Sequence, residues 1–283
     1  MAEPTDGPRM AGAFKTITSL ANPTVKAIRA LTLAKNRRES GLFIGEGLKL
    51  ATDALAAGWP IRTFVFGSGG ESRDAVEQAA AKARARGAEV LAVSQEILAK
   101  ISRRDNPQTV IGVFEARLAP AAAVEATPGA LWVALETIRD PGNLGTIVRT
   151  VDAIGASGVV LIGETVDPFS LEAVRATMGS LFHVKLVRMS LDAFLTLRRS
   201  WKGRVVGTHL SATLDCRKAR YGEPALLAMG GEQAGLSERL AAACDDLVKI
   251  PMAGAADSLN LAVATGIMLY EMRRGSLPPV GKA

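Results

Sequence analysis

The sequence predicts an α/β protein with two domains. Short apolar stretches alternate with helical stretches in both halves of the chain, as in sheets connected by helices. Segment 119–129 interrupts this alternation, because it lacks periodicity and contains two prolines. The 283 residues, 48% of them hydrophobic, are enough for two cores. We expect a disordered lead-in over 1–13, a first α/β domain over 14–118, a linker over 119–129, a second α/β domain over 130–276 and a tail over 277–283.

The first domain is expected to begin with a helix over 22–39, in which Val25, Ile28 and Leu31 have helical spacing. An apolar stretch bounded by glycines then predicts a strand over 41–47, followed by a helix over 48–58. The alternation continues with strands over 61–67, 89–94 and 109–116, and with helices over 73–87 and 95–102. These elements form a small α/β domain.

The second domain is expected to contain a parallel sheet. Six apolar stretches predict strands over 131–136, 158–163, 184–187, 204–210, 225–230 and 246–250. They are continuously apolar rather than alternating, which is typical of parallel sheets covered on both faces. Ligands bind outside the carboxyl ends of such strands. The loops 137–143, 208–213, 230–237 and 251–258 are therefore the expected site.

Composition narrows the functional class. The net charge is +6, and basic clusters at 35–38, 102–105, 198–204 and 216–220 favour a nucleic-acid partner. The apolar runs are too short to span a membrane, and the N-terminus has no apolar signal region. Two cysteines without a CxxC pair argue against a structural zinc site or a disulfide framework, which favours a cytoplasmic location.

The stretch RDPGNLGTIVRT, residues 139–150, carries two candidate functional residues. Asn143 can cap the following helix through its side chain, which would be a purely structural role. Arg149 lies in a stretch otherwise suited to packing, so a buried or half-buried arginine there needs an anionic or carbonyl partner. That partner is either a structural ion pair or a phosphate or reacting oxygen.

Two further stretches contain candidate site residues. MGGEQAGLS, residues 229–237, places two glycines after a strand, where the backbone can approach a ligand, but it matches neither a P-loop nor a GxGxxG fingerprint. In 250–271, Asp257 or Ser258 is expected to cap a long apolar helix, and Asn260 is polar in its first turn. The apolar positions of this stretch are expected in the core or an interface: Leu259, Val263, Ile267 and Tyr270.

Together these stretches resemble one family. Residues 139–163, 226–237 and 250–271 are similar to the three signature motifs of the SpoU (TrmH-like) RNA methyltransferases, and 174–186 matches the segment between the first two motifs. The resemblance covers 130–274. The first half is similar to the substrate-binding domain that precedes the catalytic domain in many members.

The resemblance implies a SPOUT-type catalytic domain with a deep trefoil knot, preceded by an L30e-like domain. It implies S-adenosylmethionine as methyl donor, methylation of a ribose 2′-hydroxyl in ribosomal or transfer RNA, and a homodimer with the active site at its interface. Ribosomal RNA is the favoured substrate. The alternatives are a transfer-RNA enzyme, a knotted base methyltransferase, or a catalytically silent RNA-binding or ribosome-assembly protein.

The resemblance also assigns residues. Those implied in the S-adenosylmethionine pocket are Thr208, Gly230, Ile250, Met252 and Leu259. Those implied at the catalytic polar positions are Asn143, Arg149, Glu232, Ser258 and Asn260. Arginine keeps its proton above about pH 12, so we expect Arg149 to stabilise a developing alkoxide rather than act as a base. No metal is implied. The segments 36–40 and 102–108 are expected RNA contacts.

Overall fold

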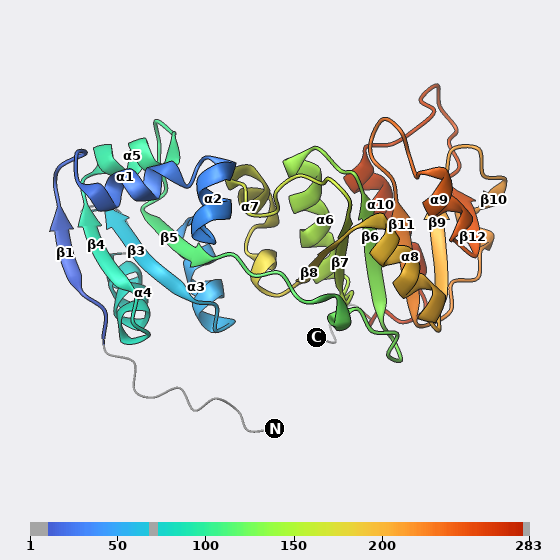
Figure 1. Cartoon of the computed structure of the whole chain (residues 1–283), viewed down its shortest axis with the longest axis horizontal. Coiled ribbons are helices and arrows are strands. Elements are labelled where there is room, and N and C mark those ends of the chain that lie inside the picture. Colours follow the sequence, from blue (N-terminus) through green and yellow to red (C-terminus); the bar gives the residue numbers. More distant parts are fainter. Residues whose placement is uncertain (1–10, 68–72, 280–283) are drawn as a thin grey trace. The chain divides into compact units, whose positions relative to one another are not determined.

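The computed structural model describes residues 11–67 and 73–279 (Figure 1). The chain divides into two compact units. The first unit contains the chain up to Ala116 together with Phe169–Phe182, and the second contains Arg117–Pro168 and the chain from His183 onward. The domain limits expected from the sequence stay predictions. Residues 1–10 of the expected lead-in and 280–283 of the expected tail lie outside the described residues.

The first unit has a five-stranded sheet in the order β1-β4-β3-β5-β2. Its strands are β1 (Phe14–Ile17), β2 (Leu42–Glu46), β3 (Ile61–Gly67), β4 (Glu89–Val93) and β5 (Val110–Glu115). Strands β1, β4 and β3 are parallel, whereas β5 runs antiparallel to β3 and β2. The helices are α1 (Pro23–Ala30), α2 (Ala34–Ser40), α3 (Leu48–Ala56), α4 (Arg73–Ala85) and α5 (Gln95–Ser102). Buried side chains of α1 and α5 pack on one face of this sheet.

The single helix expected over 22–39 is wrong, because the chain forms α1 and α2 with a break between them. Arg37 explains the break. Its side chain is buried, and its Nη1 donates to the carbonyl oxygens of Leu31 at 2.9 Å and Thr32 at 3.0 Å. A cation therefore satisfies backbone acceptors that a continuous helix would have used for its own hydrogen bonds. Of the expected RNA-contact segment 36–40, Arg37 has a structural role.

The segment Phe169–Phe182 is part of the first unit. It contains α7 (Leu171–Thr177) and the short 3₁₀ helix η2 (Ser180–Phe182). The Arg175 guanidinium binds the Glu46 carboxylate through two hydrogen bonds, of 2.9 and 2.7 Å. Phe182 packs against Phe114 with ring centroids 5.2 Å apart. A buried ion pair and aromatic contacts thus bind this segment to the first unit.

The second unit has a seven-stranded sheet in the order β10-β12-β9-β11-β6-β7-β8, and every strand pair in it is parallel. Its strands are β6 (Leu131–Glu136), β7 (Gly158–Ile162), β8 (Lys185–Met189), β9 (Arg204–Thr208), β10 (Leu214–Asp215), β11 (Ala225–Met229) and β12 (Asp246–Lys249). The prediction of an α/β fold with a parallel sheet is confirmed. The strand order changes direction at β6, with β7 and β8 on one side and β11 on the other. Such switch points are where open α/β sheets bind ligands. The knot stays a prediction.

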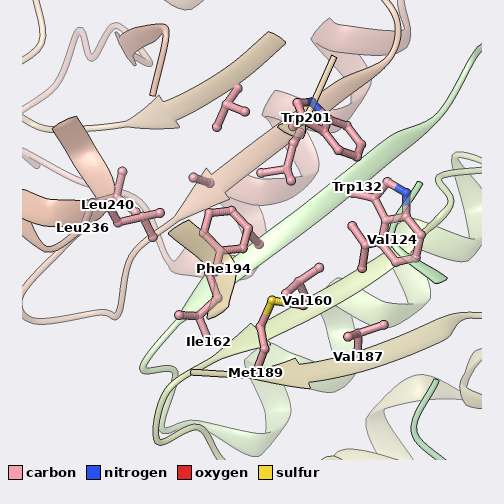
Figure 2. Packing of buried hydrophobic residues seen from close by; sticks show 14 of the residues in the cluster. Val124, Trp132, Val160, Ile162, Val187, Met189, Phe194, Trp201, Leu236 and Leu240 are labelled. Atoms are coloured by element: carbon pink, nitrogen blue, oxygen red, sulfur yellow. The ribbon is translucent and has the colours of Figure 1, made fainter. Parts of the chain in front are cut away.

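A hydrophobic cluster fills one side of the second unit (Figure 2). Trp132 of β6 and Phe194 of α8 (Leu191–Ser200) are fully buried in it, and Leu240 of α9 (Glu238–Ala242) also contributes. Val124, within the segment expected to be a linker, is buried in the same cluster, just after the 3₁₀ helix η1 (Ala121–Ala123). That segment therefore packs on the second unit. Two more helices, α6 (Pro141–Ala153) and α10 (Leu261–Arg273), pack against each other.

Candidate functional site

A cavity of about 540 Å³ opens at the carboxyl ends of β9, β11 and β12 in the second unit. Its volume lies in the range of small-molecule sites. The cavity brings together most of the residues singled out from the sequence. Those that line it are Thr208, Gly230, Glu232, Ile250, Met252, Ser258, Leu259 and Asn260.

A tight backbone turn forms one wall of the cavity. A Cβ atom on Gly230 would lie 1.9 Å from the carbonyl carbon of Gly235, so only glycine fits at this position. Gly235 has a φ of +66°, in the left-handed region that glycine adopts without steric cost. The Gly235 N–H donates to the Gly231 carbonyl oxygen at 2.9 Å and closes the turn. Backbone groups of this loop can therefore approach a ligand closely.

A buried carboxylate that was not predicted from the sequence holds the end of this loop. Glu136 at the end of β6 is 5% exposed, and its two carboxylate oxygens accept from the backbone N–H and the hydroxyl of Ser237, each at 2.7 Å. Ser237 also caps α9 by accepting from the Leu240 N–H. The signal was the single acidic residue that ends an otherwise apolar strand. Its partner, 101 residues further along the chain, could not be identified from sequence.

Asn143 does not cap its helix, in contrast to the structural role considered from the sequence. The cap of α6 is Asp140, whose Oδ1 accepts from the Asn143 backbone N–H at 2.5 Å. The Asn143 side chain is therefore available for other partners. Its Nδ2 donates to Glu232 Oε1 at 3.0 Å, and its Oδ1 accepts from Asn260 Nδ2 at 2.9 Å.

Asn260 caps α10, so the prediction of Asp257 or Ser258 as the cap is wrong. Its Oδ1 accepts from the backbone N–H groups of Ala262 at 2.9 Å and Val263 at 3.3 Å. These two donors fix the orientation of the amide, because only an oxygen can accept from them. Asn260 must then donate to Asn143, and Asn143 must donate to Glu232. The helix cap thus sets the direction of a hydrogen-bonded chain that ends on a carboxylate at the cavity.

Asp257 and Ser258 lie at the rim of the cavity instead. The Ser258 hydroxyl donates to the Asp257 carboxylate at 2.9 Å, and both residues line the cavity. Asp257 and Glu232 place two carboxylates on the cavity wall. Such a wall is electrostatically suited to a cationic ligand.

Arg149 is exposed on α6, so the prediction of a buried or half-buried arginine is wrong. The described residues that line the cavity do not include it, and within the described part of the chain it makes neither an ion pair nor a side-chain hydrogen bond. The structural ion pair considered from the sequence is therefore not formed there. A guanidinium exposed to solvent remains available to a ligand or to another chain.

An exposed apolar stripe runs along α10 and the residue just before its cap. It consists of residues expected in the core or an interface: Leu259, Val263, Ile267 and Tyr270. Tyr270 is 60% exposed, so these residues are not part of the core of the chain. Their spacing of three and four residues places them on one face of the helix. The helix α6, which carries Arg149, packs beside α10.

Two features of the described residues bear on other functions. Within residues 11–67 and 73–279, no group of three or more His, Cys, Asp or Glu side chains is arranged to hold a metal ion. In the same part of the chain no helix has the length and apolar character needed to cross a membrane.

The fold and the cavity define an α/β protein with a cavity for a small ligand at the carboxyl ends of parallel strands, and with a second, smaller α/β unit. Residues 130–270 match the family model of the SpoU rRNA Methylase family, and residues 22–112 match that of the MRM3-like substrate binding domain. The extent of similarity to curated relatives shows that this chain belongs to the SpoU rRNA methylase family.

The similarity extends over nearly the whole chain. An AdoMet-bound rRNA methyltransferase from Sinorhizobium meliloti is 52% identical, with a TM-score of 0.89, and the match covers 94% of this chain and 100% of that one. The 23S rRNA (uridine(2479)-2'-O)-methyltransferase of Streptomyces viridochromogenes is 31% identical over 93% of each chain. The 23S rRNA (guanosine(2553)-2'-O)-methyltransferase RlmP of Bacillus subtilis is 29% identical, over 92% of this chain and 100% of its own.

Proposed function

We propose that this protein is an S-adenosylmethionine-dependent methyltransferase that methylates a ribose 2′-hydroxyl in ribosomal RNA. The observation that carries the proposal is the cavity at the carboxyl ends of β9, β11 and β12, which is lined by residues of the second and third signature motifs. Asn143 of the first motif is hydrogen-bonded to two of the lining residues, Glu232 and Asn260. Relatives that match over nearly the whole chain are named 23S rRNA 2'-O-methyltransferases. One of these relatives acts on a uridine and the other on a guanosine, so family membership does not identify the nucleotide.

The cavity fits S-adenosylmethionine. Its volume of about 540 Å³ suits a ligand of this size, and Ile250, Met252 and Leu259 supply apolar contacts beside the polar backbone of the glycine turn. The carboxylates of Glu232 and Asp257 are placed to attract a ligand that carries positive charge. When bound, S-adenosylmethionine supplies an electrophilic methyl group on a sulfonium.

The protein's contribution is position and charge. The hydrogen bonds from Asn260 through Asn143 to Glu232 hold three polar side chains in one fixed orientation. Positioning of this kind can supply much of the rate of a group transfer. The attacking ribose hydroxyl must lose its proton as its oxygen becomes anionic. A guanidinium cannot accept that proton, so Arg149 acts as the stabiliser of the developing alkoxide. An RNA phosphate is the group we assign as proton acceptor.

The exposed position of Arg149 leads us to include a homodimer in the proposal. In the single chain Arg149 lies outside the described lining of the cavity, beside a helix whose exposed face is apolar. Exposed apolar patches of this kind mark interaction sites. A second copy that covers α10 would bury the stripe and bring its Arg149 to the first copy's cavity. Each active site would then use residues from two chains.

Subunit complementation tests this arrangement. Arg149→Ala removes the guanidinium, and Ala234→Trp fills the cavity from an exposed lining position, so each variant alone is expected to be inactive. If Arg149 serves the partner's cavity, a mixed dimer contains one intact site, and re-mixed subunits regain about a quarter of wild-type activity by random two-fold pairing. No recovery after verified subunit exchange would place Arg149 and the cavity of one chain in the same site.

A cytoplasmic location is part of the proposal. Both cysteines, Cys216 and Cys244, are free thiols, which is typical of proteins kept in reducing compartments. Ribosomal RNA as substrate agrees with this location.

A further inference from the structure

A second large cleft lies in the first unit, apart from the methyl-transfer cavity. It has a volume of about 760 Å³ and is bordered by α1, α5 and the residues that follow each helix. Four cations line it: Lys26 and Arg29 of α1, Lys100 of α5, and Arg103 just after α5. All four are exposed, and none of them forms an ion pair with a described residue. Arg104 also lines the cleft but lies 3.9 Å from Glu46, so it is not counted among these four.

Local helix stability explains only some of these cations. Arg29 and Lys100 lie in the last turns of their helices, where positive charge is favourable. Lys26 is the fourth residue of α1 and lies outside the last turn, so the helix dipole does not favour a cation there. It is also three residues before Arg29, on the same helical face, and like charges at that spacing repel. An anion between the two side chains would offset this repulsion.

Arg103 supplies an independent observation. It ends α5 with φ +57° and ψ +38°, a left-handed conformation that glycine or asparagine normally supplies at this position. An arginine there is sterically strained, and strained residues cluster at functional sites. The strained helix end thus carries one of the four cations of the cleft, at a position where glycine would be the relaxed choice.

The other lining residues indicate how an anionic ligand would be held. Glu96 and Asp105 are the acidic residues of the described lining, so the cations outnumber them. Leu33 is 54% exposed in the cleft, and none of the described lining residues is aromatic. Aromatic side chains are the usual stacking platforms for bases. A cleft without them is suited to a chain of phosphates, held mainly by charge, with sugar or base edges against Leu33.

We propose that the cleft between α1 and α5 binds the phosphate backbone of the substrate RNA. This inference rests on the proposed function, because it assigns the place where the same RNA is held outside the methyl-transfer cavity. The cleft reads charge rather than sequence, so it contributes affinity and salt dependence to binding. It leaves the choice of nucleotide to the other unit.

The test compares two doubly substituted variants. Lys26→Ala/Arg29→Ala removes a lysine and an arginine from the cleft. The matched control, Arg73→Ala/Lys82→Ala, removes one exposed residue of each kind from α4, outside the cleft lining and outside the segments expected to contact RNA. Affinity for in-vitro-transcribed, unmodified 23S rRNA is measured between 50 and 200 mM salt. The thermal melting point and S-adenosylmethionine affinity confirm that each variant is folded.

The expected effect follows from counterion release. Each phosphate contact to non-duplex RNA releases about 0.7 of a counterion, so loss of two contacts lowers the slope of log affinity against log salt by about 1.4. At 0.1 M salt this corresponds to about 25-fold weaker binding. The Michaelis constant for RNA rises accordingly, whereas kcat at saturating RNA stays at the wild-type value. For the control variant the slope of log affinity against log salt stays at the wild-type value to within about 0.7, the contribution of one phosphate contact.

A second variant separates strain from charge. Arg103→Gly removes a cation but relieves the left-handed conformation, so we expect weaker RNA binding with an unchanged or higher melting point.

Equal affinity and slope in the cleft variant and its control, with wild type methylating RNA, would overturn this inference and leave the proposed function intact. RNA binding that depends on the cleft, without methyl transfer by wild type, would support the inference and overturn the proposed function. Wild type that binds no RNA would overturn both.

Discussion

Asn260 combines a structural role and a site role that one substitution can separate. Its Oδ1 caps α10 through the N–H groups of Ala262 and Val263, and its Nδ2 donates to Asn143. Asn260→Asp keeps the oxygen that accepts from both N–H groups and adds a negative charge at a helix N-terminus, which stabilises by about 0.3–1 kcal/mol. Asn260→Ala removes the cap and costs about 1 kcal/mol. The aspartate variant keeps the cap that the alanine variant loses, so it is expected to be more stable than Asn260→Ala.

The same aspartate reverses the hydrogen-bonded chain. A carboxylate oxygen replaces the Nδ2 donor, so Asn143 must rotate its amide to donate to it. Asn143 then presents an oxygen to Glu232, and the hydrogen bond to that carboxylate is lost. A hydrogen bond to a charged group contributes about 1.5–3 kcal/mol. Because Glu232 and Asn260 are exposed in the single chain, we take the lower end, which corresponds to about a tenfold loss of kcat.

Urea unfolding and methyl transfer at saturating RNA measure the two effects. Asn22→Asp is the matched control, because Asn22 caps α1 in the first unit through the Thr24 N–H and lies outside both clefts. It should keep stability and kcat. Full kcat in Asn260→Asp would refute the role assigned to the direction of the hydrogen bonds from Asn260 through Asn143 to Glu232. A stability loss equal to that of Asn260→Ala would refute the cap argument.

Three further predictions concern stability and reactivity. Arg175→Ala removes the partner that makes two hydrogen bonds to the Glu46 carboxylate, whose side chain is 2% exposed. The free energy of unfolding in urea should therefore fall by about 3–5 kcal/mol, and the double variant Glu46→Leu/Arg175→Leu should recover most of this loss. Gly230→Ala places a Cβ 1.9 Å from a backbone carbon, so the melting point should fall, and the rise in melting point that S-adenosylmethionine gives wild type should be lost. An unchanged rise would contradict the conclusion that only glycine fits in this turn. Burial raises the pKa of the Cys244 thiol to about 12, so the thiolate is scarce at pH 8. Ellman's reagent should therefore react with Cys244 far more slowly in native than in urea-unfolded protein, and the native rate should rise as the pH approaches 12. Equal rates at pH 8 would contradict the burial of this thiol.

The parallel sheet could be predicted because its strands are buried on both faces. The stretch 131–136 is continuously apolar up to its last residue, and it forms β6 with those limits. The edge strand β1 was missed for the opposite reason, since three of its four residues are exposed and only Ile17 is buried. The break between α1 and α2 was missed because it depends on the contact of Arg37 with backbone carbonyls, which spacing does not reveal.

The sequence could indicate which residues meet at the site, but it could not assign their contacts. Asn143 was considered as the cap of α6, but Asp140, three residues earlier, is the cap, and this leaves the Asn143 side chain free for other partners. The partners of Asn143 are 89 and 117 residues away along the chain. Motif spacing places such residues at the same edge of a sheet, whereas donor and acceptor directions are decided by the folded backbone.

The most direct test of the central claim is the position of a transferred methyl group. Wild type and Arg149→Ala are incubated with methyl-labelled S-adenosylmethionine and unmodified ribosomal or transfer RNA, and the RNA is digested to nucleosides. We predict label in a 2′-O-methylnucleoside of ribosomal RNA with wild type, and little label with Arg149→Ala. Label in transfer RNA alone would contradict the substrate, label on a base would contradict the reaction, and no label in either RNA would contradict the proposal that the protein is an RNA methyltransferase.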